Sequence, residues 1–285
     1  MVALLKHNSE SFKRSFLLIL AYGLAFGLGE PARWFNSPVK INFYLSEQNR
    51  IAFYVLNIKD ILDLIFIGPV FTIISFILLK RILEDFNQNH DLENMEVNES
   101  FYYSLYLIAV VIFNYGNIIH VLMNRLNAQI ITEYNDKYFY YYVYFLDEFI
   151  GHFLITLGFF IIFCEMCILH TINLKFNNYT KNNEKILLEN SEHLIHSLFG
   201  IALGVATALT YLEGQCAFFF LVANTITLIF LILFSKTKRI RFKENSLLIL
   251  FTLMTITFSL VVITWAFIFG IKPYYPYYYQ ISEVR

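Results

Sequence analysis

The chain has 285 residues, of which 58% are hydrophobic and 15% are charged. Soluble domains carry about 25% charged residues, so this composition excludes a soluble globular protein and indicates one that lies in a membrane. The net charge of −1 argues against a nucleic-acid partner, which would require clustered positive charge. Three cysteines are too few for a disulfide framework.

Seven stretches are apolar over the length that a helix needs to cross a bilayer, about 17–25 residues. The predicted spans cover about residues 11–29, 59–83, 101–124, 139–170, 191–212, 216–234 and 246–269. The first apolar run lacks the pattern of a cleavable signal, so we expect it to be retained. We therefore predict an all-α, multi-pass integral membrane protein whose seven transmembrane helices form one domain over residues 1–285.

The Lys and Arg residues predict the orientation, because basic residues are enriched in cytoplasmic loops. Of the 21 basic residues, thirteen fall at the amino end or in the second, fourth and sixth loops. The loop at 236–243 alone holds five of them. We expect the amino end to be cytoplasmic and the carboxyl end to be outside.

Polar residues gather where the third predicted span ends and the fourth begins. On a helix, Asn114, Asn117, His120 and Asn124 lie within a stripe of about 120°. In the fourth span, Glu148 and His152 are four residues apart and share a face, with Asp147 beside them. We expect His120 and His152 to lie at similar depths. The fifth span returns to the same side and brings Glu213 and Gln215.

These residues form a candidate site, because ionisable groups inside a membrane are costly and are often functional. Two imidazoles and several carboxylates suit Zn²⁺ or another divalent transition metal. In this interpretation His120, His152 and Glu213 bind the metal, with Asp147 as an alternative ligand. The catalytic residues would be Asp147, Glu148 and Asn124, and Glu148 would transfer protons. A structural hydrogen-bond network and a proton or ion pathway remain the alternatives.

A second polar cluster is predicted at the opposite end of the fourth span. Its members are Glu165, His170, Glu192, His193 and His196. Its role is open, and we expect a partner for Glu165 among the two histidines that open the fifth span. Gly200 and Gly204 follow them with the small-xxx-small spacing that lets a second helix approach closely.

Two resemblances bear on function. The residues His120, Leu146-Asp147-Glu148 and Glu192-x-x-x-His196 resemble the alkaline ceramidase and progestin/adiponectin-receptor superfamily of seven-helix hydrolases. That resemblance implies His120 and His196 as zinc ligands and Asp147 as the carboxylate that holds the reactive water. The chain departs from the family at Gly116, where the family has serine. It departs again at Glu192, where the family has histidine, and in carrying this pair on the fifth span.

The second resemblance rests on His120-x-x-x-Asn124, Leu146-Asp147-Glu148-x-x-x-His152 and Glu213-Gly-Gln215. Together these motifs are similar to a family of small prokaryotic multi-pass membrane proteins without an assigned activity. The resemblance implies that residues from all three motifs form one site.

The leading functional prediction is a metal-dependent hydrolase that acts on a lipid or another membrane-accessible small molecule. The competing predictions are a transporter or proton-coupled carrier, which would use the two polar clusters, and a packing subunit of a membrane complex. The expected surroundings are the lipid bilayer, with no nucleic acid.

Overall fold

The computed structural model describes residues 17, 64, 68–90, 98–133, 142–180, 190–237, 240 and 242–270. At residues 85–90, 127–133, 175–180, 190–192, 213 and 244 it describes the backbone alone. The long helices are α4 (Gly68–His90), α5 (Glu99–Glu133), α7 (His152–Thr180), α8 (Asn190–Glu213), α9 (Ala217–Thr237) and α10 (Ser246–Phe269). A π-helix, η2 (Phe145–Gly151), leads into α7, and a short 3-10 helix, η3 (Phe242–Glu244), precedes α10. The described residues contain no strand, which confirms the all-α prediction for them.

Five stretches within the described residues are long and apolar enough to cross a membrane. They are Glu99–Leu126, Tyr142–Leu174, His193–Leu212, Ala217–Thr237 and Ser246–Phe269. These stretches match the third to seventh predicted spans, so the chain is a multi-pass integral membrane protein. The first predicted span lies almost wholly outside the described residues, and so does the beginning of the second. A count of seven therefore remains a prediction.

Two helices continue further than the sequence predicted. Helix α4 runs to His90, beyond the predicted end of the second span at residue 83, and α5 runs to Glu133, beyond the predicted end of the third span at residue 124. Neither extension contains glycine or proline, so nothing in it stops a helix. With 35 residues, α5 is about 52 Å long, whereas the hydrocarbon core of a bilayer is about 30 Å thick. Helix α5 therefore extends beyond the membrane.

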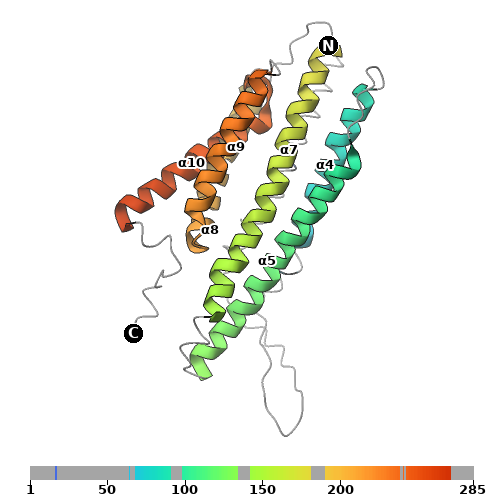
Figure 1. Cartoon of the computed structure of the whole chain (residues 1–285). Helices are drawn as coiled ribbons and strands as arrows, with labels where there is room; N and C mark the ends of the chain where they lie inside the picture. The colour runs from blue at the N-terminus through green and yellow to red at the C-terminus, as the bar shows by residue number, and fades with distance from the viewer. Residues whose placement is uncertain are drawn as a thin grey trace.

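Helix α7 lies between two groups of helices (Figure 1). On one side α5 packs along most of its length, and α4 also contacts it. On the other side α8, α9 and α10 form a second group, in which α8 packs mainly on α10. A glycine allows the close approach of α5 and α7: a Cβ at Gly158 would lie 2.6 Å from Ala109 O and Phe113 N.

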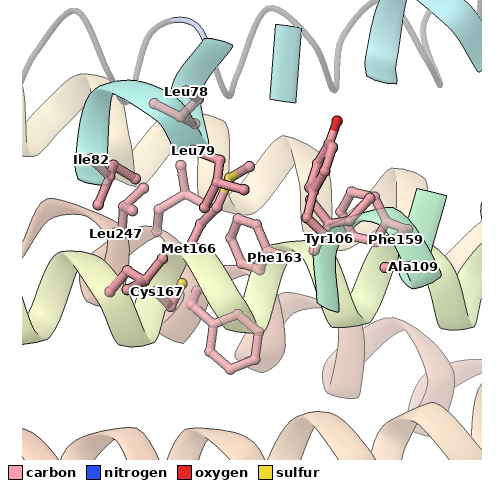
Figure 2. Packing of buried hydrophobic residues seen from close by; sticks show 14 of the residues in the cluster. Leu78, Leu79, Ile82, Tyr106, Ala109, Phe159, Phe163, Met166, Cys167 and Leu247 are labelled. Atoms are coloured by element: carbon pink, nitrogen blue, oxygen red, sulfur yellow. The ribbon is translucent and has the colours of Figure 1, made fainter. Parts of the chain in front are cut away.

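The main core lies where α4, α5, α7 and α10 meet (Figure 2). Leu78, Leu79 and Ile82 of α4 point toward Met166 and Cys167 of α7, and Leu247 of α10 lies beside them. Phe163 of α7 and Tyr106 and Ala109 of α5 continue the same cluster. Each of these side chains is at most 2% exposed. A second core joins the end of α8 to α9 and α10, around Tyr211, Phe220 and Phe258.

The contact between α8 and α10 confirms the predicted role of two glycines. A Cβ at Gly200 would lie 2.8 Å from Leu250 O, and one at Gly204 would lie 2.6 Å from Met254 O. Both distances are too short for a real side chain, so only glycine lets these two backbones approach so closely.

Helix α9 shows how the bundle meets lipid. Its buried residues are Ala217, Phe220, Asn224, Leu231 and Ser235. They recur every three, four or seven positions and therefore form one stripe on a helix. The rest of α9 is apolar and exposed, for example Phe218, Ile226 and Leu233. Apolar residues on the outside of a bundle suit contact with lipid chains.

Candidate functional site

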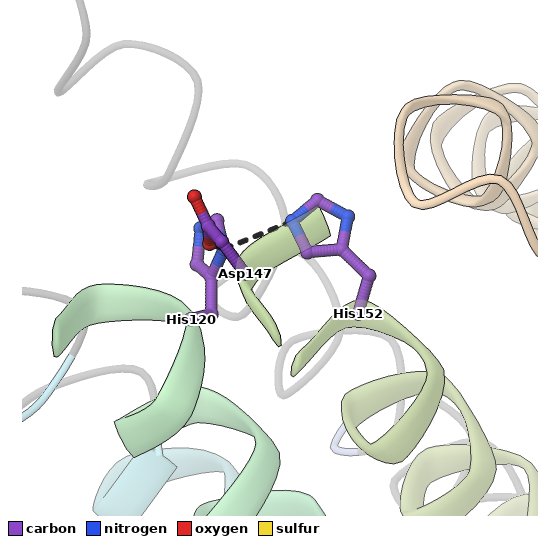
Figure 3. Close-up of polar contacts among 3 residues, drawn as sticks. All are labelled: His120, Asp147 and His152. Carbon is purple, nitrogen blue, oxygen red and sulfur yellow. Dashed lines mark hydrogen bonds and ion pairs between the residues drawn. The ribbon is translucent and has the colours of Figure 1, made fainter. Parts of the chain in front are cut away.

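Three of the predicted site residues lie in direct contact where α5 passes the beginning of α7. His120 is on α5, Asp147 is on η2 and His152 is the first residue of α7. Nδ1 of His120 lies 2.7 Å from Oδ1 of Asp147 and 3.0 Å from Nε2 of His152. The two imidazole rings are 4.4 Å apart between centroids and meet edge to face at 64°. Figure 3 shows the three side chains converging from the two helices.

This His–Asp–His cluster is largely shielded from solvent. The side chains of His120 and Asp147 are 14% and 2% exposed, and His152 is 4% exposed. His120 lies six residues before the end of its apolar stretch at Leu126, about 9 Å along the helix axis. His152 lies ten residues after the start of its stretch at Tyr142, or about 15 Å.

The π-helix η2 explains why Asp147 rather than Glu148 contacts His120. In an α-helix, residues four apart share a face, which predicts Glu148 as the partner of His152 on that face. A π-helix closes its hydrogen bonds between residues five apart and so places Asp147 in line with His152. Single π-turns of this kind are frequent at functional sites. Glu148 is buried beside the cluster, at 9% exposed.

Two glycines bring the backbones of α5 and η2 together at the cluster. A Cβ at Gly151 would lie 3.1 Å from the backbone N and Cα of His120, and one at Gly116 would lie 2.8 Å from Gly151 O. Gly116 also lies against the backbone of α7, since its Cβ would approach Ile155 N to 2.5 Å. Because these neighbours are backbone atoms, a side chain at Gly116 would push the helices apart.

The turn after α8 closes the cluster from the second group of helices. A Cβ at Gly214 would lie 2.3 Å from His152 Cβ and 2.7 Å from its Nδ1. One turn along α7, Cys216 Sγ lies 4.0 Å from Thr156 Oγ1. The sequence predicted that the Glu213-Gly-Gln turn returns to this side, and Gly214 does lie against His152.

The two contacts at Nδ1 of His120 limit where its proton can be. One ring nitrogen offers either one N–H or one lone pair. If Nδ1 carries the proton, that N–H donates to Asp147, and the lone pair of His152 Nε2 is a second acceptor for the same hydrogen. If Nδ1 is unprotonated, Nε2 of His152 can donate to it, and Asp147 cannot accept from it. The three groups therefore compete for one proton.

Three other residues predicted for this site form no hydrogen bond to the His–Asp–His cluster in the described part of the chain. Asn124, one turn beyond His120, is half-buried and forms no hydrogen bond to the cluster within the part of the chain that the structure describes. Glu213 ends α8 next to Gly214, but its side chain is outside the described residues. Asn114 faces α4 rather than the cluster, because its Nδ2 donates to Thr72 Oγ1 at 3.2 Å.

The described residues do not include a preformed metal-binding group. No group of three or more His, Cys, Asp or Glu side chains there has the arrangement that would hold a metal ion. In the cluster, Asp147 and His152 instead lie at hydrogen-bonding distance from His120. The metal-ligand roles of His120, His152 and Glu213 stay predictions, and so do the catalytic roles of Asp147, Glu148 and Asn124.

The second predicted cluster is spread over two helices. Glu165 and His170 of α7 and His196 of α8 are all buried, at 3%, 3% and 0% exposed. His193 is half-buried, and the side chain of Glu192 is outside the described residues. Glu165 is within electrostatic range of Tyr102 and Tyr106 on α5. It therefore lies toward α5, whereas the sequence suggested a partner on α8.

The sequence placed Gln215 on this side but did not predict that its carboxamide would be buried and, among the described residues, unpaired. Gln215 adopts a positive φ of 54° and is 4% exposed. Both polar atoms of its carboxamide lack a hydrogen-bond partner among the described residues. A buried, unsatisfied amide costs about 1–3 kcal/mol, so this turn carries strain directly beside His152.

Comparison with known proteins finds no matching family model, no matching curated protein and no matching solved structure. The two resemblances described above therefore stay predictions, and the function has to be inferred from the geometry of the cluster.

Proposed function

We propose that this membrane protein is a hydrolase that uses His120 for acid–base chemistry on a lipid or another membrane-accessible substrate. The observation that carries the proposal is the 2.7 Å contact between His120 Nδ1 and a nearly fully buried Asp147 carboxylate. A buried carboxylate on Nδ1 fixes the tautomer and orientation of an imidazole, which leaves Nε2 to take and return a proton.

The burial of the cluster fits this role. Asp147 is almost inaccessible, whereas the His120 side chain keeps 14% of its surface exposed. The carboxylate is thus shielded from water, which strengthens its interaction with the ring. The ring itself remains partly accessible. A general base needs both properties, because it has to be oriented by the protein and reached by a substrate.

The lipid-facing surface of α5 offers a route for an apolar substrate. Tyr115, Ile118 and Leu122 flank His120 along the helix and are 61%, 44% and 50% exposed. Because the cluster lies about two to three turns from the ends of the apolar stretches at Leu126 and Tyr142, both water and a lipid headgroup can approach it from that side. This placement supports a substrate that resides in the membrane.

The reaction can be tested without knowing the substrate. The purified full-length protein would be incubated with a mixed lipid extract in H₂¹⁸O, and ¹⁸O in newly released acids would be measured by mass spectrometry. We expect labelled product with the wild type and its loss in His120→Gln and Asp147→Asn. Glu84→Gln is the matched control, since Glu84 is an exposed carboxylate paired with Lys80 on α4. Equal product from His120→Gln and wild type would overturn the proposal.

A second candidate is a hydrolase in which the cluster holds a divalent transition metal. Asp147 and His152 both approach the same nitrogen of His120, and a cation among the three would relieve that competition. Ligands of a tetrahedral zinc lie about 3.3 Å apart, given bonds of about 2.0–2.1 Å. The observed 2.7 and 3.0 Å are shorter, so the groups would have to spread by a few tenths of an ångström.

Elemental analysis separates the two candidates. The metal version predicts about one zinc or similar ion per chain, which is lost in His120→Ala and in His152→Ala but kept in Glu84→Gln. Metal-free protein that still incorporates ¹⁸O would support the acid–base version alone. Metal-free protein without hydrolysis would contradict both.

A further inference from the structure

Glu165 is a buried carboxyl group that the His–Asp–His cluster does not use. It lies on α7 within the apolar stretch Tyr142–Leu174 and is 3% exposed. Its Oε1 has no hydrogen-bond partner among the described residues. Thirteen residues of helix separate it from His152, which corresponds to about 20 Å. Glu165 lies nine residues before the end of that stretch at Leu174, or about 13 Å. It is therefore a distinct site, in the opposite half of the stretch from His152.

The groups around Glu165 do not supply a positive charge. From α5, the titratable groups within electrostatic range are the hydroxyls of Tyr102 and Tyr106. On α7 itself, the thiols of Cys164 and Cys167 are adjacent in sequence, and both cysteines are free. Among the described residues, no Lys, Arg or His forms an ion pair with Glu165.

The other helices at this level contribute apolar side chains. Leu78, Leu79 and Ile82 of α4 pack on α7, whereas Lys80 of the same helix is exposed and pairs with Glu84. Leu247 and Phe251 of α10 belong to the same buried cluster. The described side chains that α4, α5 and α10 contribute to this core are thus mainly apolar or tyrosine, and Glu165 itself is almost fully buried.

An ionised carboxylate is unfavourable in these apolar surroundings when no positive charge is paired with it. Charged side chains near the middle of a bilayer cost about 2.5–3.5 kcal/mol even on the mildest scale. The group avoids this cost by binding a proton, since the neutral acid is far easier to bury. A glutamine would fill the same space without any charge, so a purely structural role does not require glutamate here.

We propose that Glu165 is a proton-binding site within the membrane, which holds a proton as a neutral carboxylic acid and releases it when a conformational change exposes the group. The site would allow the protein to couple a conformational cycle to proton movement. This inference is independent of the proposed hydrolysis, because it uses another residue at another depth.

Dicyclohexylcarbodiimide tests the inference, because this apolar reagent modifies protonated carboxyl groups inside membranes. The full-length protein in lipid vesicles would be treated, digested and mapped by mass spectrometry. We expect an adduct on the peptide that contains Glu165, decreasing as the pH is raised, because only the protonated acid reacts. The adduct should be lost in Glu165→Gln and kept in Glu84→Gln. Adducts at Asp147 or Glu148 fall on another part of α7 and are mapped separately.

Infrared spectroscopy gives a second readout that does not depend on reagent access. The wild type in bilayers should show a carboxylic acid C=O band that is absent in Glu165→Gln, while ¹⁸O incorporation by the same variant is unchanged. The inference is overturned if Glu165 is not modified at any pH and the C=O band is the same in both proteins. Loss of the band in His120→Gln but not in Glu165→Gln would likewise contradict it.

Discussion

Nε2 of His152 lies 3.0 Å from Nδ1 of His120, although 32 residues separate the two in sequence. The contact joins α5 to α7 next to the π-helix that carries Asp147. Polar side chains in this position hold two helices together and also compete for one proton. Structural and chemical roles therefore involve the same atoms, and substitutions have to be chosen so that the two roles can be told apart.

Asp147→Asn should separate charge from shape. Asparagine keeps the size of the side chain and an acceptor for His120, but it loses the charge. A hydrogen bond to a charged group contributes about 1.5–3 kcal/mol and a neutral one about 0.5–1.5 kcal/mol. We expect the free energy of unfolding, measured by denaturant titration in micelles, to fall by about 1 kcal/mol, with loss of hydrolysis.

Asp147→Ala should be more damaging, because it leaves a buried imidazole without its carboxylate. Removing one member of a buried pair costs about 3–5 kcal/mol. The exposed pair of Lys80 and Glu84, 3.6 Å apart, is the comparison, since breaking it in Glu84→Gln should cost less than about 0.5 kcal/mol. Equal effects of Asp147→Ala and Glu84→Gln would show that the buried contact contributes nothing.

Gly214→Ala should displace His152. The added Cβ would lie 2.3 Å from His152 Cβ, far inside van der Waals contact, so either the turn or the ring has to move. Overpacking of this kind costs about 1–3 kcal/mol. The variant should unfold at a lower temperature and lose hydrolysis, whereas Ala202→Ser, at an exposed position of α8, should do neither. A fully active Gly214→Ala protein would contradict the observed packing of the turn.

Gly116→Ala should separate α5 from α7. Its Cβ would lie 2.5 Å from Ile155 N and 2.8 Å from Gly151 O, and these backbone atoms cannot rotate away. We expect a loss of about 1–3 kcal/mol in unfolding free energy. Ser104→Ala changes an exposed position on the same helix and should have little effect. If Gly116→Ala is as stable as Ser104→Ala, the two helices do not approach each other as closely as described.

Two asparagine caps provide a test of stability away from the site. Asn245 Oδ1 accepts from Leu248 N at 3.0 Å, and its Nδ2 donates to Thr171 Oγ1 at 2.9 Å in the interior. Asn98 caps α5 through Phe101 N at 3.1 Å, but it is exposed. Because a cap contributes about 1 kcal/mol and a further buried hydrogen bond about as much, Asn245→Ala should cost about twice as much as Asn98→Ala. Calorimetry of both variants checks this ratio.

Hydropathy predicted most of the fold, because the bilayer requires long apolar helices. The third to seventh spans were located within a few residues. Their ends were less well predicted, since a helix continues past the membrane until something stops it. The predicted spans stopped at residues 83 and 124, yet the polar residues beyond them continue α4 and α5. Gly200 and Gly204 were correctly assigned to helix contact, because small residues at that spacing allow close approach.

The meeting of His120 and His152 was also predicted, from their similar depths on two consecutive helices. The choice of Asp147 over Glu148 was not predictable, because an α-helical register was assumed and the π-turn shifts it by one residue. The contact of Gly214 with His152 depends on how the second group of helices packs on α7, which local sequence does not encode. Glu165 was expected to find a partner on α8 but lies toward α5, for the same reason.

The central claim is that α5 and α7 bring two imidazoles and one carboxylate into a single hydrogen-bonded group. Magic-angle-spinning NMR of the protein in bilayers with ¹⁵N-labelled histidine tests it most directly, with His120→Gln and His152→Gln as assignment controls. We predict that the ring nitrogens of His120 and His152 show a through-space correlation, and that Asp147→Asn shifts the Nδ1 signal of His120. If the two rings show no correlation and Asp147→Asn leaves the His120 signals unchanged, the claim is contradicted.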